Sequence, residues 1–258
     1  MSETTGQLSG KRAVVTGGGA GLGRVIAETL ASRGARVAIM DVDLAGATAT
    51  QQHLASSGIE ALCFAGSVAD PDQVRSVFAA IETAWGGIDI LVNNAGISGN
   101  RPTLELTDTE WRRCLSINLD GVFYCAREAG RMMHTSGGGT IINIGSIYSI
   151  VAAPNRVHYC ASKAGVEMLT RSLAIEWAEH AIRVNCIAPG YVETALLKEL
   201  AESGRVDLER IRQRTPQKRL ATPEDIAKAV VWMCSDDASH VTGQTLAIDG
   251  GWTANGYI

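Results

Sequence analysis

The chain of 258 residues lacks the features that mark several whole classes of protein. Its charges nearly cancel, with 23 basic and 27 acidic side chains, so the sequence predicts no binding of nucleic acid and no anionic-membrane surface. No apolar run reaches the roughly 18 residues needed to span a bilayer. The segment from Met1 to Gly10 has no apolar signal core, so a cytoplasmic location is expected.

The chain has six cysteines, and their spacing matches no metal-binding or redox motif. None of the six forms a CxxC pair or a zinc-like pattern, so the sequence predicts no metal site. Cys186 lies in an apolar run, where a small buried thiol is the ordinary interpretation. Cys160 follows a tyrosine and could be a nucleophile, but no arrangement of histidine and asparagine supports that hypothesis.

Apolar β-branched runs alternate along the chain with longer segments of helical period. This alternation is typical of a doubly wound, Rossmann-type α/β fold: a parallel sheet of about seven strands with helices on both faces. No repeat, low-complexity tract or linker interrupts it, so residues 1–258 are expected to form one domain. The expected strands are 13–16, 37–40, 61–65, 88–92, 140–144, 183–188 and 245–248, and the expected helices are 22–33, 43–57, 71–85, 107–134, 158–179 and 223–235.

Several of these helices begin with capping residues. Asp70-Pro71 and Thr222-Pro223 place a cap before a proline at the first helical position. Thr107 and Glu110 have the spacing of a capping box. The least regular long stretch, 189–222, contains a helical pattern at 195–202 and is expected to be a substrate lid.

A glycine-rich turn joins the first expected strand to the first helix. The residues are Thr16-Gly17-Gly18-Gly19-Ala20-Gly21-Leu22-Gly23. Glycines let the backbone approach a pyrophosphate, and the helix N-terminus offers N–H donors and a favourable dipole. A tight turn without a ligand is the alternative, but the placement between strand and helix favours a dinucleotide site.

Asp41 closes the second expected strand, where an acidic residue can accept hydrogen bonds from the adenosine ribose. The alternative is a cap for the helix 43–57, but Asp43 fits that role better. A carboxylate here would repel a 2′-phosphate, and the neighbouring positions Ala20 and Val42 are neutral. The sequence therefore predicts NAD as the cofactor rather than NADP.

Tyr159 and Lys163 are four residues apart, and Ser146 lies thirteen residues upstream. If 158–179 is a helix, a phenol and an ammonium share one face, one turn apart. A phenol has a pKa of about 10, and a cation roughly 4 Å away favours the phenolate by about 4 kcal/mol, or roughly three pKa units. This spacing predicts a proton-transfer pair, although a helix with one aromatic residue and one solvated lysine would show the same pattern.

The chain resembles the common, roughly 250-residue type of short-chain dehydrogenase/reductase over essentially its whole length. The resemblance rests on the order and spacing of the glycine turn, Asn93-Asn94-Ala95-Gly96, Asn118, Ser146, Tyr159-Cys160-Ala161-Ser162-Lys163, Pro189-Gly190 and Asp249-Gly250-Gly251. One departure is Ser67-Val68, where many relatives have an Asp-Val pair that contacts adenine. Serine can still donate a hydrogen bond, so the adenine contact is expected to be altered.

The resemblance implies roles for these residues. Tyr159 would be the general acid/base and Ser146 would orient the substrate oxygen. Lys163 would bind nicotinamide ribose and lower the tyrosine pKa, and Asn118 would hold a helix geometry that links Lys163 to solvent. The resemblance also implies a homotetramer or a dimer, in which 107–134 and 158–179 pair across a two-fold axis. The cofactor-binding residues would be Gly17, Gly19, Gly21, Leu22, Gly23, Asp41, Ser67, Val68, Asn94, Ala95, Gly96, Tyr159, Lys163, Pro189, Gly190, Val192 and Thr194.

The expected activity is NAD-dependent interconversion of a secondary alcohol and a ketone. The expected substrate residues, which are Ser146, Tyr148, Arg156, Tyr159, Tyr191 and Glu193, suit a small polyol, sugar or hydroxy acid. Arg156 could clamp a carboxylate or phosphate, or it could be a solvated or interface arginine. His158 could tune the site, or it could have a capping or subunit-contact role.

Two alternative functions share these motifs. The first is a 3-oxoacyl thioester reductase, which usually prefers NADPH and is therefore disfavoured by Asp41. The second, from a different class, is a catalytically silent NAD-binding scaffold or regulator. The complete set of Asn118, Ser146, Tyr159 and Lys163 argues against it.

Overall fold

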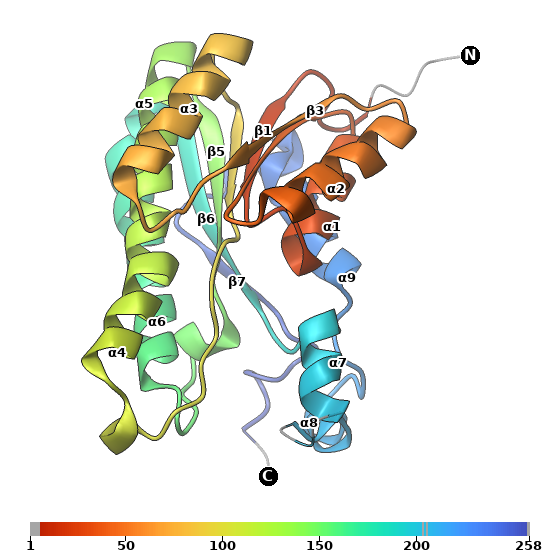
Figure 1. The fold of residues 1–258 in the computed structure, drawn as a ribbon, viewed down its shortest axis with the longest axis vertical. Helices are drawn as coiled ribbons and strands as arrows, with labels where there is room; N and C mark the ends of the chain where they lie inside the picture. The colour runs from red at the N-terminus through yellow and green to blue at the C-terminus, as the bar shows by residue number, and fades with distance from the viewer. Residues whose placement is uncertain (1–5, 203, 205, 257–258) are drawn as a thin grey trace.

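A seven-stranded parallel sheet forms the centre of the computed structural model, which describes residues 6–202, 204 and 206–256. The strands follow the order β3-β2-β1-β4-β5-β6-β7, so the winding direction reverses between β1 and β4 (Figure 1). This is the predicted Rossmann-type fold. The strands are β1 (Arg12–Thr16), β2 (Arg36–Asp41), β3 (Ala61–Ala65), β4 (Ile90–Asn93), β5 (Gly139–Ile144), β6 (Ile182–Pro189) and β7 (Thr245–Ile248).

Helices cover both faces of the sheet, as Figure 1 shows, with α3, α5 and α6 on one side and α1, α2 and α9 on the other. The central strands are therefore buried on both faces, which is why they read as continuous apolar runs. The α-helices are α1 (Gly21–Ser32), α2 (Leu44–Ser56), α3 (Pro71–Trp85), α4 (Asp108–Leu115), α5 (Gly121–Ser136), α6 (Val157–Trp177), α7 (Ala195–Glu202), α8 (Leu208–Arg214) and α9 (Pro223–Cys234). Short 3₁₀ turns are η1 (Thr103–Glu105), η3 (Ile147–Ser149), η4 (Ala178–His180) and η5 (Asp236–Ala238).

The predicted helix caps are present. Asp43 accepts a hydrogen bond from the Ala45 N–H, and Asp70 accepts bonds from the first turn of α3. Thr107 forms its capping box with Glu110, and Thr222 forms one with Asp225. These caps fix where α2, α3, α4 and α9 begin, and so the directions in which the helices leave the loops that bear the site.

The expected helix over 107–134 is present as a continuous helical span from Asp108 to Ser136, but it is not regular. A π-helical turn, η2 (Ser116–Asp120), joins α4 to α5. The fully buried Asn118 lies in this turn, where its side chain bonds to backbone far away in the sequence. These tertiary bonds account for a distortion that helical periodicity alone cannot reveal.

The two ends of the segment between β6 and α9 are joined by an isolated β-bridge. Val192 pairs with Ala221, and the Ala221 N–H donates to the Tyr191 carbonyl over 3.0 Å. Helices α7 and α8 lie between these two points (Figure 1). α7 occupies the predicted range, whereas α8 was not predicted. Among the described residues, no helix is both long and apolar enough to cross a bilayer.

Candidate active site

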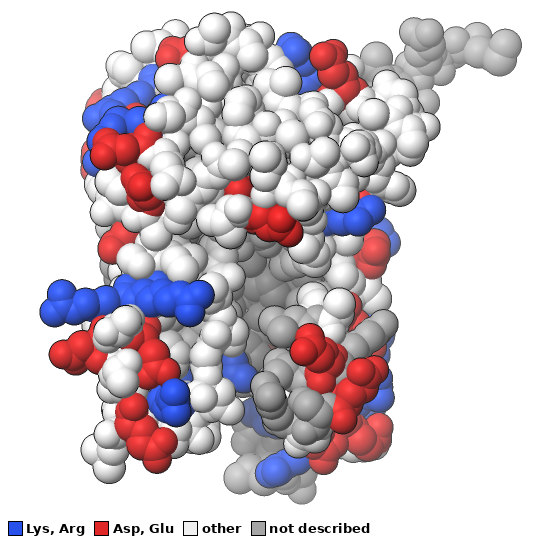
Figure 2. Space-filling view, in the orientation of Figure 1, with Lys and Arg blue, Asp and Glu red and all other residues white. Residues whose placement is uncertain are grey.

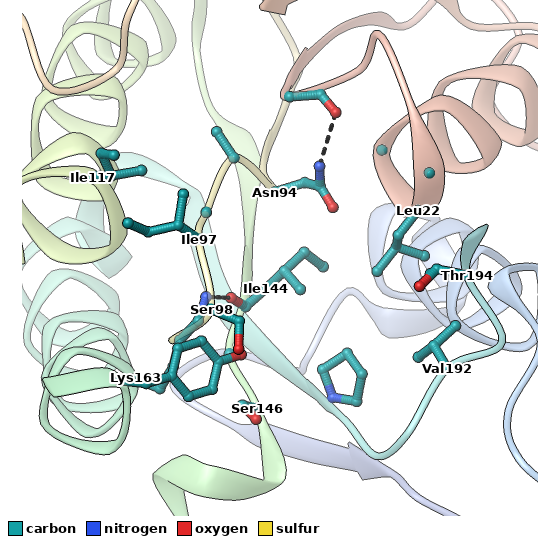
Figure 3. Close-up of a pocket in the computed structure, with 18 of the residues that line it drawn as sticks. Leu22, Asn94, Ile97, Ser98, Ile117, Ile144, Ser146, Lys163, Val192 and Thr194 are labelled. Atoms are coloured by element: carbon teal, nitrogen blue, oxygen red, sulfur yellow. Dashed lines mark hydrogen bonds between the residues drawn. The ribbon is translucent and has the colours of Figure 1, made fainter. Parts of the chain in front are cut away.

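A cavity of about 790 Å³ lies at the carboxyl edge of the sheet, where the strand order reverses. Figure 2 shows the hollow on this face, and Figure 3 shows the side chains that project into it. The cavity brings together nearly all of the site residues expected from the sequence. Those that line it are Gly17, Gly21, Leu22, Gly23, Asp41, Ser67, Val68, Asn94, Ala95, Gly96, Ser146, Tyr148, Arg156, Tyr159, Lys163, Pro189, Gly190, Tyr191, Val192 and Thr194.

The glycine turn is packed too tightly for side chains. A Cβ on Gly23 would lie 2.0 Å from the Gly17 carbonyl oxygen, and one on Gly19 would lie 2.8 Å from the Ala47 nitrogen. Gly17 itself has a φ of +65°, in the left-handed region. The turn therefore presents bare backbone and the N-terminus of α1 to the cavity, as an anion-binding cradle requires.

Asp41 is held by backbone donors on both carboxylate oxygens. The Gly19 N–H donates to Oδ2 over 2.9 Å and the Asp43 N–H donates to Oδ1 over 3.0 Å. Gly19 does not line the cavity, so its part in the site is to fix this acid. The carboxylate is thus held in one orientation at the glycine-turn end of the cavity.

Asn94 ties the fourth strand to the glycine turn. Its Nδ2 donates to the carbonyl oxygens of Thr16 and Gly17, each over 3.1 Å (Figure 3). In return, the Thr16 hydroxyl accepts hydrogen bonds from the Asn94 and Ala95 N–H groups. The two loops that flank the reversal point of the sheet are thereby joined into one surface.

Ser146, Tyr159 and Lys163 come together at the other end of the cavity (Figure 3). Lys163 is 4 % exposed, and its Nζ donates to the Ile144 carbonyl over 2.7 Å and lies 5.8 Å from the centre of the Tyr159 ring. Ser146 begins η3, and its Oγ accepts from the Tyr148 N–H over 3.1 Å. The hydroxyl, phenol and ammonium thus meet as the sequence spacing predicted.

Asn118 contributes from behind the cavity and does not line it. Its Oδ1 accepts from the Ile97 N–H over 2.8 Å, and its Nδ2 donates to the Ile97 carbonyl and to the Ser162 hydroxyl. The side chain therefore holds the loop after β4 against α6, next to Lys163. Its position agrees with the expected role of supporting the helix geometry around that lysine.

Tyr148 and Tyr191 line the cavity and form an aromatic row with Trp252, which does not line it. The hydroxyl oxygens of Tyr148 and Tyr191 are 2.7 Å apart, and Tyr191 also packs against Trp252 with ring centroids 5.1 Å apart. Asp249 fixes the turn that carries Trp252 by accepting from the Gly251 and Thr253 N–H groups. The sequence named the two tyrosines but gave no signal that they bond to each other.

Glu193 is the one expected substrate residue that the structure does not bring to the cavity. Its carboxylate lies 3.7 Å from the Arg212 guanidinium, on the unpredicted α8, and it does not line the cavity. This ion pair explains why proximity to Tyr191 in the sequence was misleading. The expectation that Glu193 contacts substrate is therefore corrected.

The remaining reactive groups are outside this arrangement. Burial raises the pKa of the Cys125 thiol to about 12 and that of Cys186 to about 11, so both are protonated and unreactive at neutral pH. His158 is buried with Nδ1 unbonded, and burial lowers its pKa. The described residues contain no cluster of three or more His, Cys, Asp or Glu side chains that could hold a metal ion.

Comparisons with known proteins agree with this geometry. A family model described as enoyl-(acyl carrier protein) reductase matches residues 17–253. The chain is 42% identical to the cis-4-hydroxycyclohexanecarboxylate dehydrogenase of Sinomonas cyclohexanicum, covering 94% of this chain and 96% of the relative. It is 38% identical to the 3-oxoacyl-[acyl-carrier-protein] reductase FabG of Escherichia coli, with coverage of 95% and 98%.

Similarity extends to solved structures. A crystal structure of a gluconate 5-dehydrogenase from Burkholderia cenocepacia, in complex with NADP and tartrate, superposes with a TM-score of 0.91. The two chains are 36% identical, and the match covers 96% of this chain and 97% of the other. The fold is thus shared with a protein whose structure is described as that of a dehydrogenase.

Proposed function

The chain belongs to the short-chain dehydrogenase/reductase family, and we propose that it uses NAD to interconvert a secondary alcohol and a ketone on a small polar substrate. The observation that carries the proposal is the convergence of Ser146, Tyr159 and Lys163 at one end of a cavity whose other end is the glycine turn. When bound, the nicotinamide supplies the hydride acceptor or donor. The protein supplies orientation and proton transfer.

Tyr159 is the proposed general acid/base. It lines the cavity on the first turn of α6, half-buried, where its phenol can take a proton from a substrate hydroxyl or return one to a ketone. Ser146 lies beside it and donates its hydroxyl proton to the substrate oxygen. The Lys163 ammonium lies 5.8 Å from the centre of the Tyr159 ring and would bind the nicotinamide ribose, and Asn118 keeps the surrounding backbone fixed.

The residues that would hold the dinucleotide fit it. The glycine cradle and the N-terminus of α1 would hold the pyrophosphate, and Asp41 would accept hydrogen bonds from the adenosine ribose. Pro189, Gly190, Val192 and Thr194 would contact the nicotinamide. Ser67 and Val68 would contact the adenine, with serine in place of the aspartate of many relatives.

NAD is preferred to NADP in this proposal because of Asp41. A 2′-phosphate on the adenosine ribose would approach a fixed carboxylate, and the next residue, Val42, is 73% exposed and carries no charge. NADP is the cofactor in the crystal structure of the Burkholderia gluconate 5-dehydrogenase, so the preference can differ between similar chains. Asp41 supports NAD here.

The proposed substrates are polyols, sugars and hydroxy acids. Support comes from the mixed wall of Ser98, Tyr148, Arg156 and Tyr191, and from relatives that act on gluconate and on a hydroxycyclohexanecarboxylate. The 3-oxoacyl reductase remains the second candidate because the chain is 38% identical to FabG. An acyl thioester with NADPH as the better substrate pair would favour that candidate.

Three further parts of the proposal concern architecture. The segment 189–222 is proposed as a lid that is anchored at the Val192–Ala221 bridge. A homotetramer or dimer is proposed because α5 and α6 expose large apolar side chains, with Phe123 38%, Met168 57% and Ile175 82% exposed.

A cytoplasmic location is proposed, and the six unpaired thiols suit a reducing compartment.

Replacement of Tyr159 by phenylalanine tests the assignment. Wild-type enzyme is mixed with NAD and a panel of polyols, sugars and hydroxy acids, and reduced nicotinamide is followed by absorbance. We expect Tyr159→Phe to lower turnover by about 10²- to 10⁴-fold, the range for loss of a general acid/base. Tyr124→Phe, a half-buried tyrosine on α5, is the matched control and should retain activity.

Two results would speak against the proposal. Turnover by Tyr159→Phe equal to that of wild type would remove the proton-transfer role. Cofactor binding by wild type without turnover of any alcohol, ketone or acyl thioester would instead favour the silent scaffold.

A further inference from the structure

Two arginines lie at opposite ends of the aromatic row on the substrate side. The Arg156 guanidinium carbon lies 5.3 Å from the centre of the Tyr148 ring, and that of Arg214 lies 3.9 Å from the centre of the Trp252 ring. Of these two arginines, Arg156 lines the cavity and Arg214 does not. The row therefore presents one cation to a bound substrate, at its Tyr148 end.

Arg156 has no acidic partner among the described residues. The only hydrogen bond that its guanidinium makes there is a long one of 3.3 Å from Nη1 to the Ser98 hydroxyl. By contrast, the nearby Arg101 pairs with Glu110 at 2.9 Å. A planar guanidinium that lies over an aromatic ring keeps its in-plane N–H groups available, and these match a carboxylate in two parallel bonds.

The substrate end of the cavity contains no acidic side chain. Asp41 is the one carboxylate among the lining residues, and it belongs to the glycine-turn end. Glu193 is kept away by its pairing with Arg212. Lys163 is engaged with the Ile144 carbonyl. Arg113, an exposed residue of α4, also lines the cavity, but Arg156 is the lining arginine that lies over the aromatic row.

The row between Arg156 and Tyr159 suits a hydrocarbon skeleton more than a polyhydroxylated one. The hydroxyls of Tyr148 and Tyr191 bond to each other over 2.7 Å, so one of their two O–H donors is already used and the pair offers a substrate a single free O–H. The Tyr148 ring centre lies 6.4 Å from that of Tyr159. The guanidinium and the proposed acid/base are thus both close to one ring, with an apolar surface between them.

Resting on the proposed function, we propose that Arg156 selects hydroxy acids whose carboxylate lies about one six-membered carbon ring away from the carbinol. The carboxylate binds the guanidinium in two hydrogen bonds, and the carbon skeleton packs on the Tyr148 ring. The carbinol carbon gives its hydrogen and the bonding electron pair to the oxidised cofactor, and the hydroxyl proton goes to Tyr159. The products are the keto acid, reduced cofactor and a proton, with the carboxylate unchanged.

A pair of substrates that differ only in charge tests the proposal. Values of kcat/KM with NAD are measured for cis-4-hydroxycyclohexanecarboxylate and for the corresponding uncharged carboxamide. We expect wild type to prefer the acid by about 10- to 100-fold, the range for a hydrogen-bonded charge pair. In Arg156→Leu the acid-to-amide ratio should fall to about one, through a higher KM for the acid.

Two variants control this measurement. Arg156→Lys retains the charge but loses the two-bond geometry, so its ratio should lie between those of wild type and Arg156→Leu. Arg214→Leu removes the cation at the other end of the same row, and its ratio should remain that of wild type. Turnover of the amide by Arg156→Leu reports that this variant is folded and able to react. If Arg156→Leu does not turn over the amide, the acid-to-amide ratio of Arg156→Lys is compared with that of wild type instead.

Binding gives a second measurement that does not depend on turnover. Cyclohexanecarboxylate, which lacks the reacting hydroxyl, should compete with a neutral alcohol in wild type and at least tenfold more weakly in Arg156→Leu. Equal inhibition of the two proteins, or an acid-to-amide ratio that Arg156→Leu leaves unchanged, overturns the role of Arg156. If wild type oxidises neutral alcohols but does not prefer the acid, the inference fails and the proposed function stands. If it oxidises no alcohol at all, both fail.

Discussion

The hydroxyl oxygens of Tyr148 and Tyr191 lie 2.7 Å apart and join the loop after β5 to the loop after β6. Burial and the hydrogen bond with Tyr191 both raise the pKa of Tyr148, so the Tyr148 phenol is neutral at any physiological pH. Tyr191 rests on Trp252, whose turn is fixed by Asp249. The bond thus links the residues beside Ser146 to the C-terminal turn and to the base of the 189–222 segment.

Tyr191→Phe should therefore weaken catalysis while leaving the fold intact. Tyr148 loses its partner, at a cost of about 1–3 kcal/mol for a half-buried hydroxyl, and its ring can move away from Tyr159. We expect kcat/KM to fall by about tenfold with any accepted alcohol, mainly through KM. Steady-state kinetics and circular dichroism check this, with Tyr124→Phe as the control. Unchanged kinetic constants would mean that the bond has no part in substrate positioning.

Asp41 predicts a change in cofactor preference. In Asp41→Ser the carboxylate that would face a 2′-phosphate is gone, while serine can still accept from the Gly19 N–H. The ratio of kcat/KM for NAD to that for NADP should fall by at least about tenfold, or ~1.4 kcal/mol. Asp43→Ser removes an equal charge two residues away and preserves a helix cap. If Asp43→Ser shifts the ratio as much, the effect is one of general charge and not of contact with the ribose.

His158 predicts a pH dependence of stability. Burial lowers its pKa in the folded protein, Arg156 lowers it further and the Glu110 carboxylate opposes the shift, with a net lowering. The unfolded chain binds a proton at about pH 6.5, whereas the folded chain binds it only at lower pH. The contribution is thus present above pH 6.5 and is lost as pH falls toward the folded pKa.

His158→Phe isolates this effect. Phenylalanine fills a similar space and removes Nδ1, which has no hydrogen-bond partner in the folded chain. Urea unfolding at a series of pH values should show a smaller loss of stability below pH 6.5 in the variant than in wild type. At neutral pH the two should differ by no more than about 1 kcal/mol, because replacing an unsatisfied polar group by an apolar one is nearly neutral. If the free energy of unfolding falls with pH equally steeply in wild type and in His158→Phe, a group other than His158 causes the loss.

The sheet and most helices could be predicted because their signals are local. The strands of a sheet buried on both faces read as apolar runs, and Asp70, Thr107 and Thr222 mark helix starts by capping chemistry within four residues. The placement of the candidate catalytic residues could be predicted for a similar reason. Tyr159 and Lys163 share a helix face, and the glycine turn lies between one strand and the next helix.

The features of the structure that the sequence did not predict depend on contacts between residues far apart in the chain. The π turn follows from bonds between Asn118 and Ile97, 21 residues apart. The tyrosine pair joins residues 43 apart. α8 is a seven-residue, mostly charged segment with only Ile211 buried, so its periodicity is weak, and Glu193 was misplaced because its partner Arg212 lies on that helix. No local pattern contains these pairings.

The last prediction concerns a buried chain of side-chain hydrogen bonds that links the sheet to α6. Asn93 Nδ2 donates to Asn143 Oδ1 over 2.9 Å, and Asn143 Nδ2 donates to the Thr170 hydroxyl over 2.9 Å. All three side chains are at most 3 % exposed. Thr170 is on the helix that carries Tyr159 and Lys163, so this chain of bonds helps to set the position of the catalytic residues on the sheet.

Asn143→Leu should lower both stability and activity. Leucine has a similar volume but removes the acceptor of the Asn93 amide, at about 1–3 kcal/mol, and the donor to the Thr170 hydroxyl, which keeps its own bond to the Val166 carbonyl. For a chain of this size we expect the unfolding temperature to fall by about 4–15 °C. The control Asn100→Leu makes the same change on an exposed loop and should shift it by less than about 2 °C. Differential scanning calorimetry at one fixed protein concentration measures both. If Asn143→Leu melts with wild type, the amide chain contributes nothing to holding α6, and the position of Tyr159 depends on packing alone.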